Sequence, residues 1–436
     1  MLRKDIPIFN TPNTNNILAR LTRVFQNKRL ALFTLTITFL VYVSNGVLGA
    51  DFNIISPLAQ GFSDQLHPLS ESKSQKEVFG FGPFWTINKL DNVDFNVLTT
   101  FSYFGVPILA DGSMDTTYQG YQVFESETAT QVFKKAHQYG TRVVLTVTMM
   151  DNADIRALMD DPEAQDRSIR QTVSLVKQRG IDGVNIDFEY MGNPGPAYRS
   201  AFSNYVKNMT TAMHTAVPSS RVTVSVYASA VKDPKIYDLT AVSNNSDGIF
   251  MMAYDFAVAS SDQAIPTAPL YGYKQGKYWY DVSTAVDDFL AYMPAEKLIL
   301  GVPWYGYNYM VYSPGVKVDT RPAWSGRGFA QTYAIVQTDV TPDMSGIYEY
   351  ATGWDDTGKV GWKAYYDADS GSWRQVFIDD VKSLGIKFDF AKDKNLGGVG
   401  IWALGFDNGK KDFWALLDRK FGAKYADASV INKEIN

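Results

Sequence analysis

Hydrophobic and polar residues alternate along a short stretch near the middle of the chain, residues 181–190. The apolar positions are Val184, Ile186 and Phe188, and the polar positions between them are Asn185, Asp187 and Glu189. On a β-strand, every second side chain shares one face, so two acids and an amide point the same way. Helical patterns flank the stretch, which favours a buried parallel strand over an edge strand whose polar face meets water.

These flanking helical patterns, with apolar residues at three-to-four spacing, cover residues 166–179 and 197–216. Short apolar strands alternate with helical patterns along most of the chain. The predicted strands are 78–85, 97–106, 142–149, 183–189, 221–227, 248–254, 298–303 and 398–404. Eight strands with mostly helical connections predict an α/β fold, a (β/α)8 TIM barrel. The first connection is too short for a full helix, so one helix should be reduced or missing.

The barrel should occupy residues 77–425, followed by a tail at 426–436. Its seventh unit is unusually long, because roughly 70 residues separate the seventh strand from the next helical pattern, too many for a bare loop. This segment is rich in Tyr, Trp, Gly and Asp. We predict a small α+β insertion at about 308–378, between the seventh strand and its helix.

The N-terminal region has the pattern of a membrane-targeting segment. Residues 1–29 are polar with basic residues toward their end, residues 30–50 are largely apolar, and residues 51–76 form a polar linker. Positive charge before an apolar run marks the cytoplasmic side of a membrane. The run suits either a cleaved signal peptide or a membrane anchor. Both alternatives predict an extracellular or cell-surface protein, with residues 30–50 in the membrane if they are uncleaved.

Composition excludes several classes of function. The chain of 436 residues has a formal net charge of -5 and a pI near 5.4, which offers no basic surface for nucleic acid. It contains no cysteine, so disulfides and thiolate metal sites are excluded. None of its three histidines stands at a predicted strand end, so neither a Ser-His-Asp site nor a typical zinc site is supported. We expect no metal and no cofactor, with acid and base chemistry left to carboxylates, tyrosines or lysines.

Barrel enzymes build their sites at the C-terminal ends of the strands. Here those ends carry many aromatic residues and a few acids. They are Trp85, Tyr103, Glu189, Tyr190, Tyr227, Tyr254, Asp255, Trp304, Tyr305 and Trp402. A single aromatic residue in a strand is more often part of the core than a ligand. Aromatic faces also stack on the C–H faces of sugar rings, so their recurrence at strand after strand favours a sugar groove.

On these residues the sequence resembles glycoside hydrolase family 18, the chitinases and their relatives. The family patterns DGxDxDxE, MxYD, GxPxYG and GGxxxW occur in order at residues 182–189, 252–255, 301–306 and 397–402. Asn185 replaces the first aspartate of the triplet, the third-strand SxGG is absent, and Tyr307 with Tyr309 stand where Arg and Trp often follow. At Asn185 and in the stretch 302–307, the sequence resembles the di-N-acetylchitobiase branch of this family.

The resemblance implies substrate-assisted hydrolysis. Glu189 would protonate the glycosidic oxygen while the 2-acetamido oxygen of the sugar attacks the anomeric carbon. Asp187 would bond the acetamido N–H, and Tyr254 would donate to its carbonyl. We expect Asn185 to orient Asp187 by hydrogen bonding and Trp402 to floor the sugar site. The expected substrate-binding set is Asn185, Asp255, Trp402, Tyr305, Trp304, Trp85, Tyr103 and Tyr227.

The leading hypothesis is an exported, monomeric glycosidase that cuts β-1,4 bonds next to N-acetylglucosamine, in chitin-type oligomers or in peptidoglycan glycan. A carbohydrate-binding protein without turnover is the alternative, although lectin-like members of the family usually lose the acid that Glu189 retains. A wall-anchoring protein held through residues 30–50 is a third hypothesis. The sequence does not decide whether the substrate is chitin or peptidoglycan, or whether the action is exo or endo.

Overall fold

The computed structural model describes residues 76–322 and 328–422. The predicted cytoplasmic segment 1–29, the membrane segment 30–50, most of the linker and the tail 426–436 lie outside these residues. Within the two described ranges, no helix combines the length and the apolar character needed to cross a bilayer.

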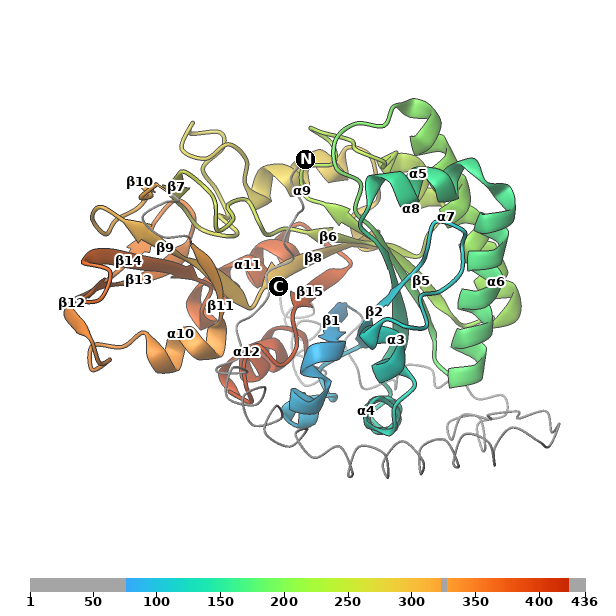
Figure 1. Ribbon diagram of the computed structural model, residues 1–436, viewed down its shortest axis with the longest axis horizontal. Helices are drawn as coiled ribbons and strands as arrows, with labels where there is room; N and C mark the ends of the chain where they lie inside the picture. The colour runs from blue at the N-terminus through green and yellow to red at the C-terminus, as the bar shows by residue number, and fades with distance from the viewer. Residues whose placement is uncertain (1–75, 323–327, 423–436) are drawn as a thin grey trace, which may run out of the picture. The chain divides into compact units, whose positions relative to one another are not determined.

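A closed barrel of eight parallel strands forms the centre of the described chain (Figure 1). Its strands, in the order in which they neighbour one another, are β1 (Glu77–Pro83), β15 (Gly398–Trp402), β8 (Leu298–Pro303), β6 (Gly248–Met252), β5 (Arg221–Tyr227), β4 (Gly183–Phe188), β3 (Arg142–Met149) and β2 (Thr100–Pro107). The predicted (β/α)8 barrel is confirmed. Several predicted strands run a few residues past the observed C-terminal ends, where the chain has already turned into the loops of the barrel mouth.

Helices follow most of the strands and cover the outside of the barrel (Figure 1). They are α3 (Gln119–Phe124), α4 (Glu127–Gln138), α5 (Asn152–Asp160), α6 (Pro162–Arg179), α7 (Pro196–Ala216), α8 (Leu239–Asn244), α9 (Val282–Leu290), α11 (Val381–Asp393) and α12 (Asp412–Phe421). Local sequence sets the ends of α6: Asp161 caps its first turn, and Gly180 ends it in the left-handed conformation. After β1 there is only the 3-10 helix η1 (Phe84–Asn92), which confirms that the first helix is reduced.

The barrel interior has a polar half and an apolar half. The polar half lies on β2 to β5, where short side chains bond across strands: Ser102, Thr146, Asn185, Thr223 and Ser225. The apolar half is a cluster of Phe79, Phe81, Val144, Phe250, Met252 and Ile299. The Phe250 ring has room only because glycine stands at 301 and 400. A Cβ at Gly301 or Gly400 would lie 2.5 or 2.1 Å from the ring. The aromatic cluster fills the barrel beneath the mouth and leaves the polar groups of β4 on one side.

Glu77 closes the opposite end of the barrel. Its carboxylate lies 3.3 Å from Arg221 and 3.8 Å from Arg142, and Thr99 donates to it at 2.7 Å. Burial acts to raise the pKa of Glu77, but Arg221, Arg142 and the hydroxyls of Thr100 and Thr99 outweigh it and hold the pKa below its usual range. Since the folded pKa is lowered, the carboxylate stabilises the fold above the unfolded pKa, about 4.3, and this is lost as pH falls through the folded pKa.

We therefore expect Glu77→Gln to lower the free energy of unfolding by about 3 kcal/mol at pH 7, because two arginines lose their buried partner. The difference should begin to shrink as pH falls below the unfolded pKa of about 4.3, and it should be lost once pH falls through the lower folded pKa and the parent carboxylate is protonated as well. Urea denaturation at pH 7 and at a pH below the folded pKa measures this. Asp389→Asn, which removes a partner of Lys420 at the surface, is the control and should cost less than about 1 kcal/mol. Equal losses for Glu77→Gln at both pH values would contradict the assignment.

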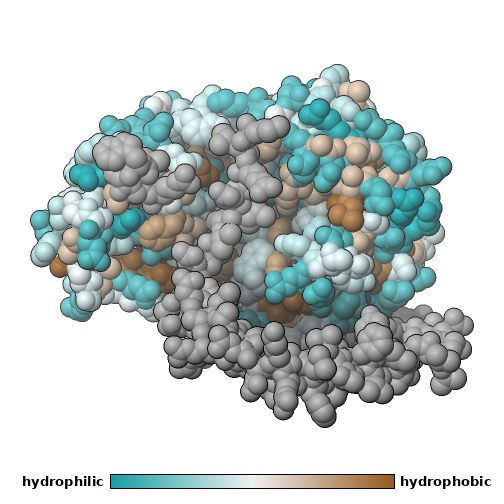
Figure 2. Space-filling model, viewed as in Figure 1, coloured by the Kyte–Doolittle hydropathy of each residue, from teal (hydrophilic) through white to brown (hydrophobic). Residues whose placement is uncertain are grey.

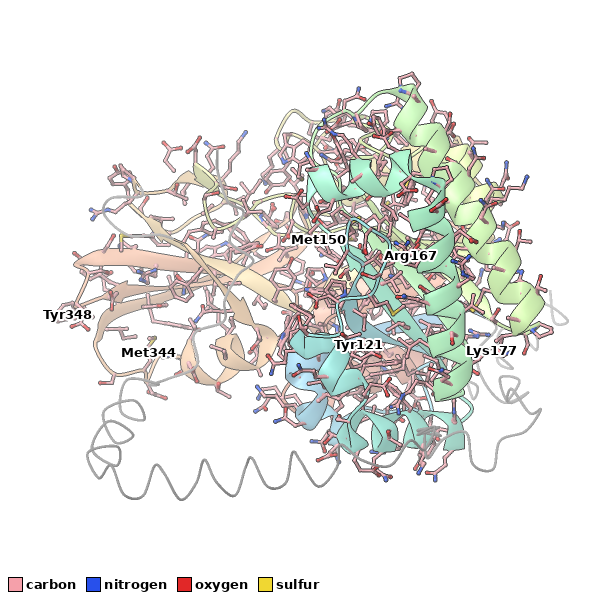
Figure 3. All side chains as sticks on the ribbon, turned by 45° about the vertical axis from the view of Figure 1, so that its right-hand side comes forward. Tyr121, Met150, Arg167, Lys177, Met344 and Tyr348 are labelled. Carbon is pink, nitrogen blue, oxygen red and sulfur yellow. The ribbon has the colours of Figure 1, made fainter. Side chains whose placement is uncertain are left out.

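The predicted α+β insertion is confirmed between β8 and α11. It is an antiparallel sheet in the order β11 (Phe329–Thr332), β9 (Tyr305–Val311), β14 (Ser372–Ile378), β13 (Val360–Asp367) and β12 (Ile347–Asp355), with α10 (Tyr333–Asp339) beside it. It begins at Tyr305, slightly before the predicted residue 308. Two residues at its outer end, Met344 and Tyr348, are labelled in Figure 3. The described face seen in Figure 2 is mainly hydrophilic, with hydrophobic residues in scattered patches.

Candidate active site

The inward face of β4 carries Asn185 and Asp187, as the alternation predicts. Asn185 is 0% exposed and Asp187 is 3% exposed. The Asn185 amide donates to Ser225 Oγ at 2.9 Å, and Thr223 Oγ1 donates to the amide oxygen at 2.8 Å. Asn185 is therefore held by β5. It makes no direct hydrogen bond to Asp187 within the described residues, although we expected one. Ser225, which accepts the Asn185 bond, also acts on the Asp187 carboxyl by lowering its pKa.

Asp187 has one carboxyl oxygen, Oδ1, that is buried and makes no hydrogen bond within the described part of the chain. Burial raises the pKa of Asp187 well above its usual range, the charge of Glu189 raises it further, and a hydrogen bond from Ser225 opposes both effects. A buried oxygen without a partner is costly in the free protein, and it is placed to accept a hydrogen bond from a ligand.

Glu189 follows β4 directly and is partly exposed at the barrel mouth. Its backbone N–H donates to the carbonyl oxygen of Met149 at 2.9 Å. The hydroxyl of Tyr227, at the end of β5, donates to Glu189 Oε2. Burial, and next the charge of Glu189, raises the pKa of Tyr227 far above its usual range, so the phenol stays protonated and remains a donor. One oxygen of the Glu189 carboxyl is thereby fixed in position.

Tyr254 and Asp255 stand just beyond β6. Burial and the neighbouring charges of Asp187, Asp255 and Glu189 raise the pKa of Tyr254, so it too is a neutral hydrogen-bond donor. Asp255 has a left-handed backbone, with φ of 59°, and its side chain is exposed. Tyr305 donates to Asp255 Oδ1, and Tyr307 donates to the same oxygen at 3.0 Å. These bonds tie the first strand of the insertion to the mouth of the barrel.

Trp402, at the end of β15, lies on the aromatic cluster of the barrel interior. Its ring is 5.5 Å from that of Phe81 and 4.8 Å from that of Phe104, both edge to face. Trp85 is 38% exposed, and its ring lies 6.5 Å from that of Trp402. The two indoles thus meet edge to face, and together they offer aromatic surface on which a sugar ring can stack.

Tyr103 and Trp304, which we expected to bind substrate, lie elsewhere. Tyr103 is 0% exposed and donates to the carbonyl oxygen of Gly120 at 2.7 Å, with its ring against helices α3 and α4. Trp304 is also 0% exposed and packs on Phe413 and Trp414 of α12. Both side chains belong to the packing between the barrel and its outer helices, so we leave them out of the sugar-binding set.

Sequence reasoning missed several residues that support the site. Ser225 and Thr223 hold Asn185, and Tyr237 donates to the carbonyl oxygen of Phe188 at 2.8 Å. Thr223, Ser225 and Tyr227 alternate along β5 in the same way as the polar residues of β4, and this signal could have identified the first two. Tyr237 lies in a loop without such a pattern.

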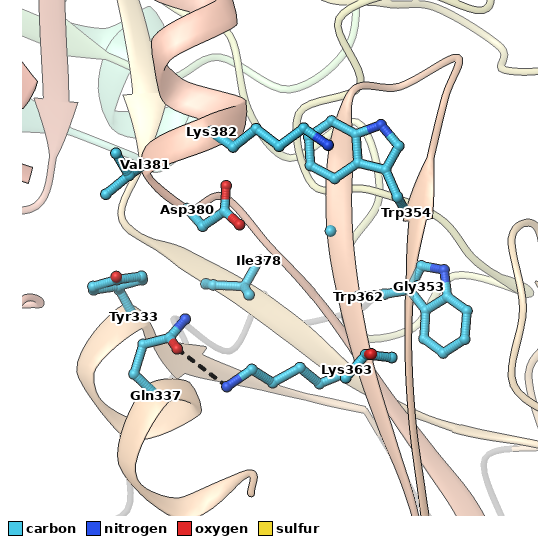
Figure 4. A pocket seen from close by; sticks show the side chains of 12 residues that line it. Tyr333, Gln337, Gly353, Trp354, Trp362, Lys363, Ile378, Asp380, Val381 and Lys382 are labelled. Atoms are coloured by element: carbon cyan, nitrogen blue, oxygen red, sulfur yellow. Dashed lines mark hydrogen bonds between the residues drawn. The ribbon is translucent and has the colours of Figure 1, made fainter.

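A separate cavity of about 710 Å³ lies in the insertion, beside α10 and the start of α11 (Figure 4). There Lys363 donates to Gln337 Oε1 at 3.1 Å and to two backbone carbonyls, and the Lys382 ammonium lies 3.6 Å from the centre of the Trp354 ring. The cavity includes none of the carboxyls of the barrel mouth. Within the described residues there is also no cluster of three His, Cys, Asp or Glu residues that could hold a metal.

A parallel (β/α)8 barrel with two close carboxyls and aromatic rings at its mouth is the architecture of a glycoside hydrolase. The chain belongs to glycosyl hydrolases family 18, whose model matches residues 72–407. Among curated relatives, di-N-acetylchitobiase of Mus musculus is 26% identical over 302 residues, covering 67% of this chain and 77% of the relative. The cortical fragment-lytic enzyme of Bacillus subtilis (strain 168) is 23% identical, covering 64% of this chain and 60% of the relative. The family and the affinity to the chitobiase branch are confirmed.

Solved structures agree on the fold. A chitinase from Rhizomucor miehei superimposes with a TM-score of 0.66 at 21% identity, covering 79% of this chain and 100% of its own. A spore cortex-lytic enzyme from Bacillus megaterium QM B1551 superimposes with a TM-score of 0.61 at 17% identity, covering 81% of this chain and 75% of its own.

Proposed function

We propose that this chitinase-like hydrolase is exported and cleaves β-1,4 bonds next to N-acetylglucosamine with retention of configuration. The observation that carries the proposal is the pair Asp187 and Glu189, in which a buried, unpartnered carboxyl oxygen lies next to an acid fixed by Tyr227. An acetamido N–H is the donor that such an oxygen lacks. The curated relatives named chitobiase and the structures titled chitinase support the same substrate class.

In the first step, Glu189 gives its proton to the glycosidic oxygen, and the bond from that oxygen to the anomeric carbon breaks. The acetamido carbonyl oxygen forms a new bond to the anomeric carbon, which gives an oxazolinium ion. Asp187, as a carboxylate, accepts a hydrogen bond from the acetamido N–H and stabilises this cation. Tyr254 donates a hydrogen bond to the acetamido oxygen. In the second step, water attacks the anomeric carbon, the bond from that carbon to the acetamido oxygen breaks and the neutral acetamido group is restored. The water gives a proton to Glu189, which restores the acid.

The test is digestion of defined N-acetylglucosamine oligomers and of purified peptidoglycan by the full-length chain. Mass spectrometry gives the product lengths, and ¹H NMR during the reaction gives the anomeric configuration of the new reducing ends. We expect products with initial β configuration, which is retention. Initial α configuration would exclude the substrate-assisted route. Binding of oligomers without any product would favour the carbohydrate-binding alternative.

A further inference from the structure

An exposed aromatic and basic surface lies on the two loops that follow β5 and β6. It consists of Lys232, Tyr273 and Trp279, and we call it the rim patch. Trp279 is 51% exposed and Tyr273 is 38% exposed. The Lys232 ammonium lies 4.7 Å from the centre of the Tyr273 ring and 5.7 Å from that of Trp279. Large exposed aromatic groups gathered in one place mark a binding surface more often than single ones do.

The rim patch is held in a fixed geometry. The Trp279 indole N–H donates to the carbonyl oxygen of Phe256 at 2.6 Å, and its ring stacks on Tyr280 with centres 5.7 Å apart and planes at 25°. Lys232 donates to the backbone oxygen of Trp279 at 3.2 Å. An exposed ring that is already ordered loses little conformational entropy when a ligand binds. The geometry therefore suits recognition.

The charge of the rim patch is not neutralised by its neighbours. Lys232 makes no ion pair with any described carboxylate, whereas Lys235 in the same loop pairs with Asp233 at 3.1 Å. Three rings surround the Lys232 ammonium, because Tyr280 is also within 5.3 Å of it. Aromatic faces attract the cation but leave it able to accept an anionic partner.

The rim patch is continuous with the candidate active site on both loops. Phe256, which accepts the Trp279 bond, directly follows Asp255 of the site. On the other loop, the Lys235 ammonium lies 5.0 Å from the ring of Tyr227, whose hydroxyl donates to Glu189. A glycan chain that leaves the catalytic centre on this side would meet Trp279 and Lys232 next.

We infer that the rim patch binds a carboxylate-bearing substituent of the glycan, with Lys232 as the cation and Trp279 as the platform for a sugar ring. Glycans of N-acetylmuramic acid carry this group, either on the lactyl ether itself or on the peptide attached to it. Neutral chitin carries none. The inference rests on the proposed function and selects peptidoglycan-type chains as the better substrate of the same site.

The test uses the full-length chain and three oligomers of equal length: neutral N-acetylglucosamine, muramic acid type with free lactate, and muramic acid type with peptide. Turnover is measured for the parent and for rim-patch variants that keep Glu189. Kd is measured by calorimetry for the same variants combined with Glu189→Gln. We expect Lys232→Gln to raise KM and Kd about tenfold for the anionic oligomer that fits, as loss of a charged hydrogen bond implies. The neutral oligomer should change less than twofold, and kcat should not change. A larger rise in KM and Kd for the oligomer with free lactate identifies the lactyl carboxylate as the ligand of Lys232, and a larger rise for the oligomer with peptide identifies the peptide carboxylate.

Three further variants complete the test. Lys232→Arg should restore binding of the anionic oligomer, and Trp279→Ala should weaken all three oligomers. Tyr348→Ala is the matched control, because Tyr348 is 76% exposed but lies at the outer end of the insertion (Figure 3). If the parent cleaves the oligomers and Lys232→Gln affects no anionic oligomer, the inference about the rim patch is overturned and the proposed function stands. If anionic binding depends on Lys232 but the parent cleaves nothing, the rim patch is supported and the proposed function is overturned.

Discussion

Replacing Glu189 with glutamine is expected to lower kcat on an N-acetylglucosamine oligomer by about 10⁴-fold, the upper end for general acid–base catalysis. The loss is large because, in the proposed mechanism, one carboxyl serves both steps, first as the acid for the leaving oxygen and then as the base for water. Glutamine can still accept the hydrogen bond that Tyr227 donates to Oε2. KM should therefore change less than about threefold, since binding is retained while transition-state stabilisation is lost. Initial rates over a range of oligomer concentrations separate the two constants.

Glu349→Gln is the matched control for this experiment, because it makes the same chemical change at an exposed position of β12. Its rates should equal those of the parent within about twofold, as for most surface substitutions. Circular dichroism and the melting temperature show whether each variant is folded. A folded Glu189→Gln variant that keeps a tenth of the parent kcat would mean that another group protonates the leaving oxygen.

The site on β4 could be predicted from sequence because its two faces differ in chemistry. Apolar Val184 and Ile186 alternate with polar Asn185 and Asp187, so only one orientation buries the apolar face against the surrounding helices. At the end of β2 the pattern lacks this contrast. Tyr103 and Phe104 are adjacent aromatic residues on opposite faces, and either one could have pointed inward. The structure turns Phe104 toward Trp402 and Tyr103 toward the helices.

Trp304 shows a second reason why the direction of a side chain cannot always be predicted from sequence. It lies between the last residue of β8 and the first residue of β9, at the point where the chain leaves the barrel for the insertion. The direction of its side chain depends on α12, whose Phe413 and Trp414 receive the indole. This contact joins residues far apart in sequence, so no local pattern contains it. The rim patch depends in the same way on two loops that meet only in the folded chain.

Replacing Asp187 with asparagine is expected to lower kcat by about 10²- to 10³-fold, as for loss of one electrostatic contact to a developing charge. The amide cannot become the carboxylate that, in the proposed mechanism, stabilises the oxazolinium ion. The pH profile should change as well, because burial and the charge of Glu189 raise the pKa of Asp187, whereas asparagine does not titrate. The change in kcat/KM that the titration of Asp187 causes should therefore be absent from the profile of the variant. A profile of the same shape for parent and variant would contradict a role for the titration of Asp187.

The same substitution should stabilise the fold. A carboxyl whose folded pKa is raised costs stability as pH rises from its unfolded pKa toward its folded pKa, and this cost is greatest above the folded pKa. Asp187→Asn removes the cost and should raise the free energy of unfolding at pH 7. Asp182→Asn in the same motif should do the opposite, because Asp182 bonds His137 and the backbone N–H of Val143, each at 2.7 Å. Urea denaturation and kcat, measured on both variants, should show stability gained with activity lost at Asp187, and stability lost with activity kept at Asp182. Stability lost at both positions would mean that Asp187 supports the fold and is not held there at a cost for catalysis.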